Sequence, residues 1–189
     1  MVFSVASGNF GNICAGILAR EIGLPIRTFV AATDSNKIVS NYLYTQEYEA
    51  GPSIATISNA MDVGNPSNFI RIQRMFQNEF GTLKANLSSY SFDDVSTKIA
   101  MKEVFETNGY IMDPHGAVGY LGLQTFLKKN LEHYGVFLET AHPVKFLDTV
   151  ESAIGEKPEI PESIQDLLEK QKLILSIKDY SGLKEFLLK

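Results

Sequence analysis

Residues 2–12 constrain the fold of this chain more than any other stretch. Residues 2–6 (Val-Phe-Ser-Val-Ala) form a short, mostly apolar run, which is typical of a strand buried on both faces. An apolar helical stripe follows and ends at residues 23–25 (Gly-Leu-Pro); it is made of Ile13, Cys14, Ile17, Leu18 and Ile22. We therefore predict a strand, a tight loop and a helix that begins near Ile13.

Two glycines, Gly8 and Gly11, lie in the loop between this strand and this helix. Glycine lets the backbone approach a ligand closely, and a helix start offers unpaired N–H groups together with the positive end of the helix dipole. A phosphate group suits such a place. The alternative is a tight turn in which the glycines serve only their dihedral angles, and the spacing alone leaves both interpretations open.

Charge and composition exclude several classes of protein. The net charge of the 189 residues is −5 and no basic stripe is present, which argues against a nucleic-acid partner. The single cysteine, Cys14, allows no internal disulfide and suits a reducing compartment. No run approaches the ~18 apolar residues that a membrane span needs, and no signal peptide is visible. We expect a cytoplasmic protein without a membrane partner.

Further segments predict an α/β fold. Buried strands are expected at residues 26–33 and 135–140, with shorter ones at 54–57 and 110–112. Helices are expected to cover both faces of a mostly parallel sheet, which gives three layers. One helix should carry the row Phe69, Ile72, Phe76 and Phe80 down to Gly81. Another should start at Pro114, with Asp113 as its N-cap.

The last 34 residues, 156–189, differ in sequence pattern from the rest of the chain. A linker at residues 156–161 contains two prolines and is followed by helical and apolar segments. We expect residues 1–155 to form the α/β domain and residues 156–189 to form an extension. Since a core strand begins at residue 2, we also expect the chain to be a piece of a longer protein.

Five short motifs occur in the order that one enzyme family has them. They are residues 7–12 (Ser-Gly-Asn-Phe-Gly-Asn), 31–33 (Ala-Ala-Thr), 58–63 (Ser-Asn-Ala-Met-Asp-Val), 113–120 (Asp-Pro-His-Gly-Ala-Val-Gly-Tyr) and 140–143 (Thr-Ala-His-Pro). From about residue 2 to about residue 155 the chain resembles the threonine synthases, which are pyridoxal-phosphate enzymes of fold type II.

The resemblance implies a function and a set of site residues. It implies that the parent enzyme converts O-phosphohomoserine and water to threonine and phosphate, and that this chain is part of the large domain. It places the cofactor phosphate on Gly8, Asn9, Phe10, Gly11 and Asn12, and it places Thr140 opposite the pyridine nitrogen. The family's Schiff-base lysine lies upstream of the loop, so we expect no catalytic residue in this chain and no activity from it alone.

Other assignments stay open or point to structural roles. Without the resemblance, the preferred interpretation of Thr140 is a strand-end residue that bonds local backbone. Asp62 is expected to fix a loop, and Asn59 could line the substrate side or do the same. The histidines His115 and His142 lie near helix starts, where the dipole disfavours the charged ring, so neutral structural roles are expected. The histidines and the single cysteine lack the spacing of a metal site.

Two alternative functions compete with threonine synthase. One is another fold-type II pyridoxal-phosphate enzyme, such as a lyase of the dehydratase kind, because those enzymes share the phosphate loop. The other is a non-catalytic module that binds a phosphate-bearing ligand. We also expect the chain to self-associate through the face that carries Ser7 and Thr140, because an absent portion would normally cover that face.

Overall fold

The computed structural model describes residues 1–168 and 170–189. These residues form two units, Met1–Pro158 and Glu159–Lys189. The second unit contains α8 (Glu162–Leu168) and α9 (Tyr180–Leu187), and the N-cap of α9 is Asp179, whose side chain accepts a hydrogen bond from Gly182 N at 2.8 Å. The apolar run at residues 173–177 has no regular secondary structure. Of the helices in the described residues, none has both the length and the apolar character for crossing a bilayer.

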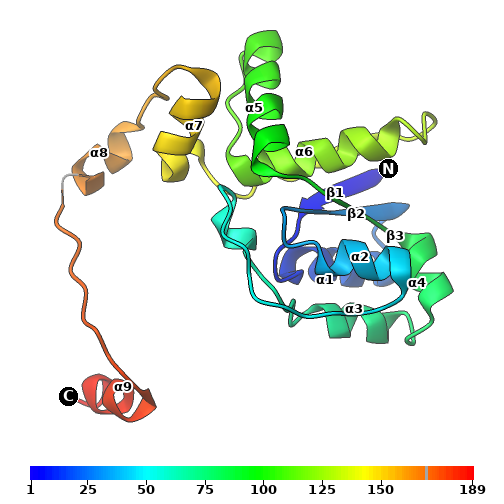
Figure 1. The fold of residues 1–189 in the computed structure, drawn as a ribbon, viewed down its shortest axis with the longest axis horizontal. Coiled ribbons are helices and arrows are strands. Elements are labelled where there is room, and N and C mark those ends of the chain that lie inside the picture. Colours follow the sequence, from blue (N-terminus) through cyan, green and yellow to red (C-terminus); the bar gives the residue numbers. More distant parts are fainter. Residues whose placement is uncertain (169) are drawn as a thin grey trace. The chain divides into compact units, whose positions relative to one another are not determined.

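A four-stranded sheet in the order β3-β2-β1-β4 organises the first unit. Strands β1, β2 and β3 are labelled in Figure 1. Its strands are β1 (Val2–Ala6), β2 (Thr28–Thr33), β3 (Leu87–Ser91) and β4 (Gly135–Phe137). Strand β1 is central, with Val2 in register with Thr28 of β2 and with Gly135 of β4. Every pairing among the described strands is parallel, which confirms the predicted sheet.

Helices cover both faces of this sheet, as predicted. One face packs against α1 (Gly11–Glu21), α2 (Ile38–Thr45), α3 (Phe69–Met75) and α4 (Phe80–Asn86). The other face packs against α6 (Pro114–Leu127); α5 (Asp94–Asn108) contacts α6, and α7 (Leu147–Ile154) contacts α5. Strand β2 shows the alternation, since Phe29 and Ala31 belong to the α1 side whereas Val30 and Ala32 belong to the α6 side.

Three predictions about local structure were wrong. The helix expected to run to Gly81 is two helices, because Gln77 and Asn78 adopt left-handed φ values of 55° and 59° between α3 and α4. The segments 54–57 and 110–112 pair with no strand among the described residues. In the first of these, side chains occupy the backbone donors, since Asn36 Oδ1 accepts from Ile54 N at 2.7 Å.

The first helix also differs from its predicted form. It begins at Gly11, two residues before Ile13, and its buried residues are Ile13, Cys14 and Ile17. Leu18 and Ile22 are 52% and 80% exposed, so the predicted stripe is narrower than its apolar residues suggest. In contrast, Asp113 does cap α6 through its side chain, with Pro114 at the first helical position.

Candidate ligand site at the carboxyl ends of the strands

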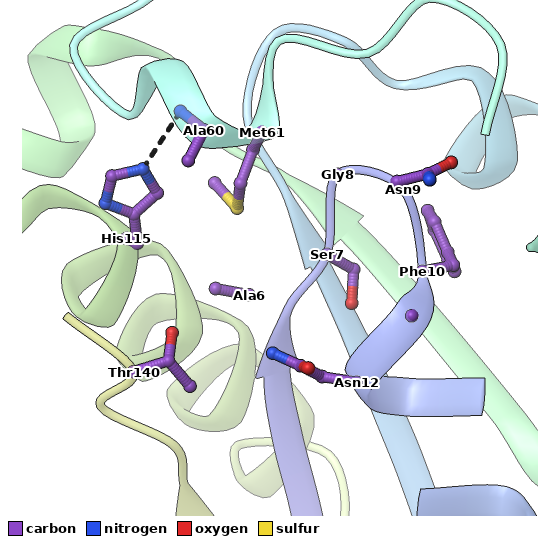
Figure 2. A pocket seen from close by; sticks show the side chains of 11 residues that line it. Ala6, Ser7, Gly8, Asn9, Phe10, Asn12, Ala60, Met61, His115 and Thr140 are labelled. Atoms are coloured by element: carbon purple, nitrogen blue, oxygen red, sulfur yellow. Dashed lines mark hydrogen bonds between the residues drawn. The ribbon is translucent and has the colours of Figure 1, made fainter. Parts of the chain in front are cut away.

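One pocket gathers the loop 7–12 and Thr140 at the carboxyl ends of the parallel strands. Figure 2 shows the loop on one side of this pocket and His115 and Thr140 on the other. Ala60 and Met61, from the short 3-10 helix η1 (Asn59–Met61), complete the wall. The cavity is about 190 Å³, which suits the phosphate end of a ligand. Ligands of open α/β sheets bind at this edge.

The start of α1 faces this pocket with free backbone donors. The first intrahelical bond runs from Cys14 N to Phe10 O at 3.0 Å, so the N–H groups of Gly11, Asn12 and Ile13 precede it. No side chain caps this helix, and its first turn contains no acidic residue. An anion at this end of the helix would therefore meet donors and the positive end of the dipole without a competing carboxylate.

Phe10 carries the strained backbone of the loop. Its φ and ψ are 60° and 19°, the left-handed region that non-glycine residues seldom adopt. Its ring is 3% exposed and meets Phe69 edge-on with 5.7 Å between centroids. The buried ring holds the loop in this conformation, as expected where packing over-determines a strained residue.

The two loop glycines differ in what surrounds them. A Cβ on Gly8 would lie 2.5 Å from the Cα of Met61, so only glycine allows the loop to pack against η1. A Cβ on Gly11 would lie 3.6 Å from Asn68 Nδ2, which is ordinary contact. Among the described glycines, those with positive φ are Gly23, Gly109 and Gly155, so Gly8 and Gly11 are not needed for their dihedral angles.

Asn9 anchors the loop to the segment before α3. Its side-chain oxygen accepts from Ser67 N at 2.6 Å and from Ser67 Oγ at 2.9 Å. Its backbone oxygen accepts from Asn68 Nδ2 at 3.0 Å. The Asn9 side chain therefore positions the loop, although the residue lines the pocket.

Thr140 follows β4 and brings a hydroxyl to the opposite wall. The residue is exposed and its hydroxyl has no hydrogen-bond partner within the described parts of the chain, so it is available to a ligand. Sequence reasoning had already singled out the loop residues and Thr140. It missed Ala6, Ala60 and Met61 as pocket residues, although Ala60 and Met61 lie inside the motif 58–63.

His115 is a neutral bridge between two elements. The ring is buried, its Nδ1 lies 2.6 Å from Asp113 Oδ1, and its Nε2 accepts from Ala60 N at 3.2 Å. Because Nε2 accepts a hydrogen bond, it carries no proton, and the ring proton lies on Nδ1 toward the carboxylate. The predicted structural role of His115 is confirmed, and the histidine ties η1 to α6.

Asp62 fixes the loop before η1, as predicted. Its Oδ2 accepts from Thr56 N at 3.1 Å and its Oδ1 accepts from Thr56 Oγ1 at 2.7 Å. The same hydroxyl lies 3.0 Å from Oδ2 of the buried Asp34. Burial raises the pKa of Asp34, although its hydrogen bonds with Asn36 and Thr56 oppose that effect.

Two further residues lie outside the lining of this pocket. Asn59 is exposed in η1. His142 caps the 3-10 helix η2 (Pro143–Phe146), where its Nδ1 accepts from Val144 N at 3.2 Å. In the part of the chain that the structure describes, no three His, Cys, Asp or Glu side chains are grouped to hold a metal ion.

Comparison with known proteins finds the same family that the sequence motifs resemble. Residues 116–187 match the family described as "Threonine synthase, C-terminal". Over all 189 residues the chain is 40% identical to the threonine synthase of Buchnera aphidicola from Baizongia pistaciae. Over its whole length the chain is therefore similar to part of the threonine synthases. It spans 43% of the length of that curated relative.

Solved structures agree in sequence and in fold. The crystal structure of Escherichia coli threonine synthase covers 99% of the chain with a TM-score of 0.89 and 38% identity, and the chain covers 43% of it. A threonine synthase from Brucella melitensis with bound pyridoxal phosphate gives a TM-score of 0.84 at 26% identity, over 98% of the chain and 45% of its own. The fold is that of the fold-type II pyridoxal-phosphate enzymes.

Proposed function

We propose that this chain is the cofactor-facing portion of a pyridoxal-phosphate-dependent threonine synthase. The observation that carries the proposal is one pocket formed by the uncapped start of α1 and, from the opposite wall, by Thr140. The loop 7–12 and Thr140 are 128 or more positions apart in the chain, yet they meet at the edge where parallel sheets bind ligands. In the whole enzyme the reaction would convert O-phosphohomoserine and water to threonine and phosphate.

The loop residues would bind the cofactor phosphate. The N–H groups of Gly11, Asn12 and Ile13 supply donors, and the helix dipole favours a dianion there. Gly8 and Phe10 shape the loop, and Asn9 anchors it, so these three residues would act by positioning those donors. The residues present fit a phosphate, because the first turn of α1 is free of both a side-chain cap and an acidic residue.

Thr140 would orient the ring of the cofactor. A hydroxyl can donate to an unprotonated ring nitrogen, whereas a carboxylate at that position would favour a protonated one. When bound, pyridoxal phosphate supplies the electron sink for carbanion chemistry, and the protein tunes it through such contacts. The free Thr140 hydroxyl supports this role.

The division of the chain into domains and the cellular location of the enzyme are part of the same proposal. Residues 1–155 would form the cofactor-facing domain and residues 156–189 an extension, in a cytoplasmic enzyme of threonine biosynthesis. The lysine that forms the Schiff base in this family would come from outside this chain, because none of its lysines matches the family's motif. The chain alone should therefore release no phosphate from O-phosphohomoserine.

An anion-binding experiment tests the proposal. Inorganic phosphate or pyridoxal phosphate, titrated into the ¹⁵N-labelled chain, should shift the amide signals of residues 8–13. Asn12→Asp keeps the shape of the side chain but adds a negative charge at the helix start, so it should weaken phosphate binding roughly tenfold or more. Asn108→Asp at the other end of a different helix is the matched control and should leave binding unchanged.

The outcome also separates the alternative functions. Unchanged phosphate binding in Asn12→Asp would remove the loop as the anion site. Binding of phosphate without any binding of pyridoxal phosphate would favour the non-catalytic module. If an upstream lysine-bearing segment from a relative restores turnover with O-phosphohomoserine but not with serine or threonine, a dehydratase is excluded.

A further inference from the structure

Two buried carboxyl groups, Asp113 and Glu139, meet behind the wall that carries Thr140. Asp113 is the N-cap of α6 and is 0% exposed. Glu139 directly precedes Thr140 after β4, and its carboxyl group rests against the backbone of Gly116 in the first turn of α6, where a Cβ would overlap it. The pair therefore joins the chain segment of Thr140 to α6.

The hydrogen bonds of this pair are incomplete unless a proton is shared. Asp113 Oδ1 accepts from His115 N at 2.9 Å and faces His115 Nδ1 at 2.6 Å. Asp113 Oδ2 and both carboxyl oxygens of Glu139 are buried, and no donor from the described residues reaches them. An ionised carboxylate can only accept, so two ionised groups at this place would repel each other and leave all three oxygens unpaired.

The surroundings decide which of the two groups carries the proton. Asp113 has two N–H donors on one oxygen and lies at the positive end of α6, so its negative charge is stabilised. Glu139 has no such donor. We propose that Glu139 is a neutral carboxylic acid that donates its proton to Asp113 Oδ2 and thereby positions Thr140 at the ligand pocket.

The electrostatics of the two groups support this assignment. Burial raises the pKa of Glu139 to about 9, and the adjacent Asp113 adds to that effect. Burial acts in the same direction on Asp113, but its hydrogen bonds with His115 and Glu139 prevail, and the pKa of Asp113 lies below its usual value. The other titratable groups near the pair are His115 on α6 and Tyr110 ahead of α6, whose pKa is raised by burial and by the two carboxyl groups.

With the proton on Glu139, a continuous chain of hydrogen bonds connects the segment of Thr140 to η1, and both of these line the pocket. It runs from Glu139 to Asp113, from Asp113 to His115, and from His115 Nε2 to the N–H of Ala60 in η1. Thr140 lies at one end and η1 at the other. Glu139 is thus a positioning residue, and only its effect on cofactor binding rests on the proposed function.

Infrared spectroscopy of the chain without cofactor tests the proton directly. A buried protonated carboxyl group gives a C=O stretching band that ionised carboxylates lack. We expect this band at pH 7, we expect it to disappear with a midpoint near pH 9, and we expect Glu139→Gln to abolish it. Glu151→Gln, an exposed glutamate on α7, is the matched control and should leave the band unchanged.

Two more variants distinguish a shared proton from a merely structural side chain. Asp113→Asn removes the neighbouring charge, so the midpoint of the band should fall by roughly 1–3 pH units. Glu139→Gln preserves a donor to Asp113, so its Tm should stay within about 1 °C of the original, whereas Glu139→Ala should lower Tm by roughly 4–8 °C. The amide signal of Thr140 should move in Glu139→Ala and stay in place in Glu139→Gln.

Three results would overturn the proposal. The band could be absent at pH 7 in the unaltered chain, it could persist in Glu139→Gln, or Tm could rise strongly with a particular cation because a bound ion replaces the proton. None of these readouts uses pyridoxal phosphate, so a failure here leaves the phosphate-binding proposal standing. Conversely, a chain that binds no phosphate could still show the band.

Discussion

Gly8 of the loop and Met61 of η1 are in backbone contact, so close that a Cβ on Gly8 would lie 2.5 Å from the Met61 Cα. This contact joins the loop 7–12 to the segment that His115 holds from the other side through Ala60 N. The shape of the pocket therefore depends on interactions between its own walls, in addition to the strands that carry them.

The first prediction separates the two loop glycines. Gly8→Ala should lower the free energy of unfolding by roughly 1–3 kcal/mol, because the new methyl group meets backbone that cannot move aside easily. Gly11→Ala has room and begins a helix, so its change should be within about 1 kcal/mol of zero. Chemical denaturation of both variants measures the difference. Equal losses in the two variants would contradict the role assigned to Gly8.

A second prediction concerns the bridge made by His115. In His115→Phe the ring volume is largely kept but both ring nitrogens are lost, so the N–H of Ala60 loses its acceptor. Amide hydrogen exchange at Ala60 should become at least about tenfold faster, since roughly one hydrogen bond of about 1.4 kcal/mol no longer protects it. The amide of Ile17 inside α1 is the internal control and should exchange as before. Unchanged exchange at Ala60 would show that the bond contributes nothing.

Sequence reasoning recovered the layers of the fold because its evidence was local. The apolar runs that became β1 and β2, and the capping residue Asp113, depend on neighbours within a few positions. The break between α3 and α4 was not recoverable, because Phe76 and Phe80 keep helical spacing across two residues of left-handed backbone.

The site was predicted only in part, because only some of its residues lie in motifs that can be recognised locally in the sequence. The loop and Thr140 were found as motifs, but the wall made by Ala60 and Met61 depends on how η1 packs against Gly8. Glu139 gave no signal at all in the sequence. Its environment arises only when β4 brings it against Gly116 and Asp113, which are more than twenty positions away.

The third prediction is a pH dependence of stability. Glu139 binds its proton more tightly in the folded chain, where its pKa is about 9, than in the unfolded chain, where it is near the ordinary 4.5. Its contribution is therefore fully present below about pH 4.5 and is lost as pH rises toward 9. Urea denaturation between pH 6 and pH 9, on a ~1-unit grid, should show the free energy of unfolding falling in the unaltered chain.

The same series in Glu139→Gln is the control for that prediction. The amide does not titrate, so the slope with pH should be flatter than in the unaltered chain. Tyr110, whose pKa is raised by burial, remains in both proteins. Parallel slopes in the two proteins would mean that Glu139 is already ionised in the folded state.

A fourth prediction tests the hydroxyl between Asp34 and Asp62. Thr56 Oγ1 has one proton, yet it lies 2.7 Å from Asp62 Oδ1 and 3.0 Å from Asp34 Oδ2. Thr56→Val removes that donor while keeping the shape, and should lower the free energy of unfolding by roughly 1–3 kcal/mol. Thr56→Ser should restore most of the loss. If valine and serine have the same effect, packing rather than hydrogen bonding is responsible.

The last prediction is that the chain self-associates through the face that carries Ser7 and Thr140. The first strand does not provide an exposed edge, because β1 is paired on both sides. The open edge next to the pocket belongs to β4, which runs directly into Glu139 and Thr140, and its Val136 is 39% exposed. Unpaired strand edges of this kind readily pair with another chain.

Light scattering across a dilution series measures that association. Thr140→Lys places a charge at the pocket mouth and should move the association midpoint to a concentration roughly tenfold higher or more. Val95→Lys changes a residue of α5 that is 66% exposed and serves as the control, with no expected shift. A monomer at every concentration, or equal effects of the two lysines, would show that this face does not mediate contact between copies of the chain.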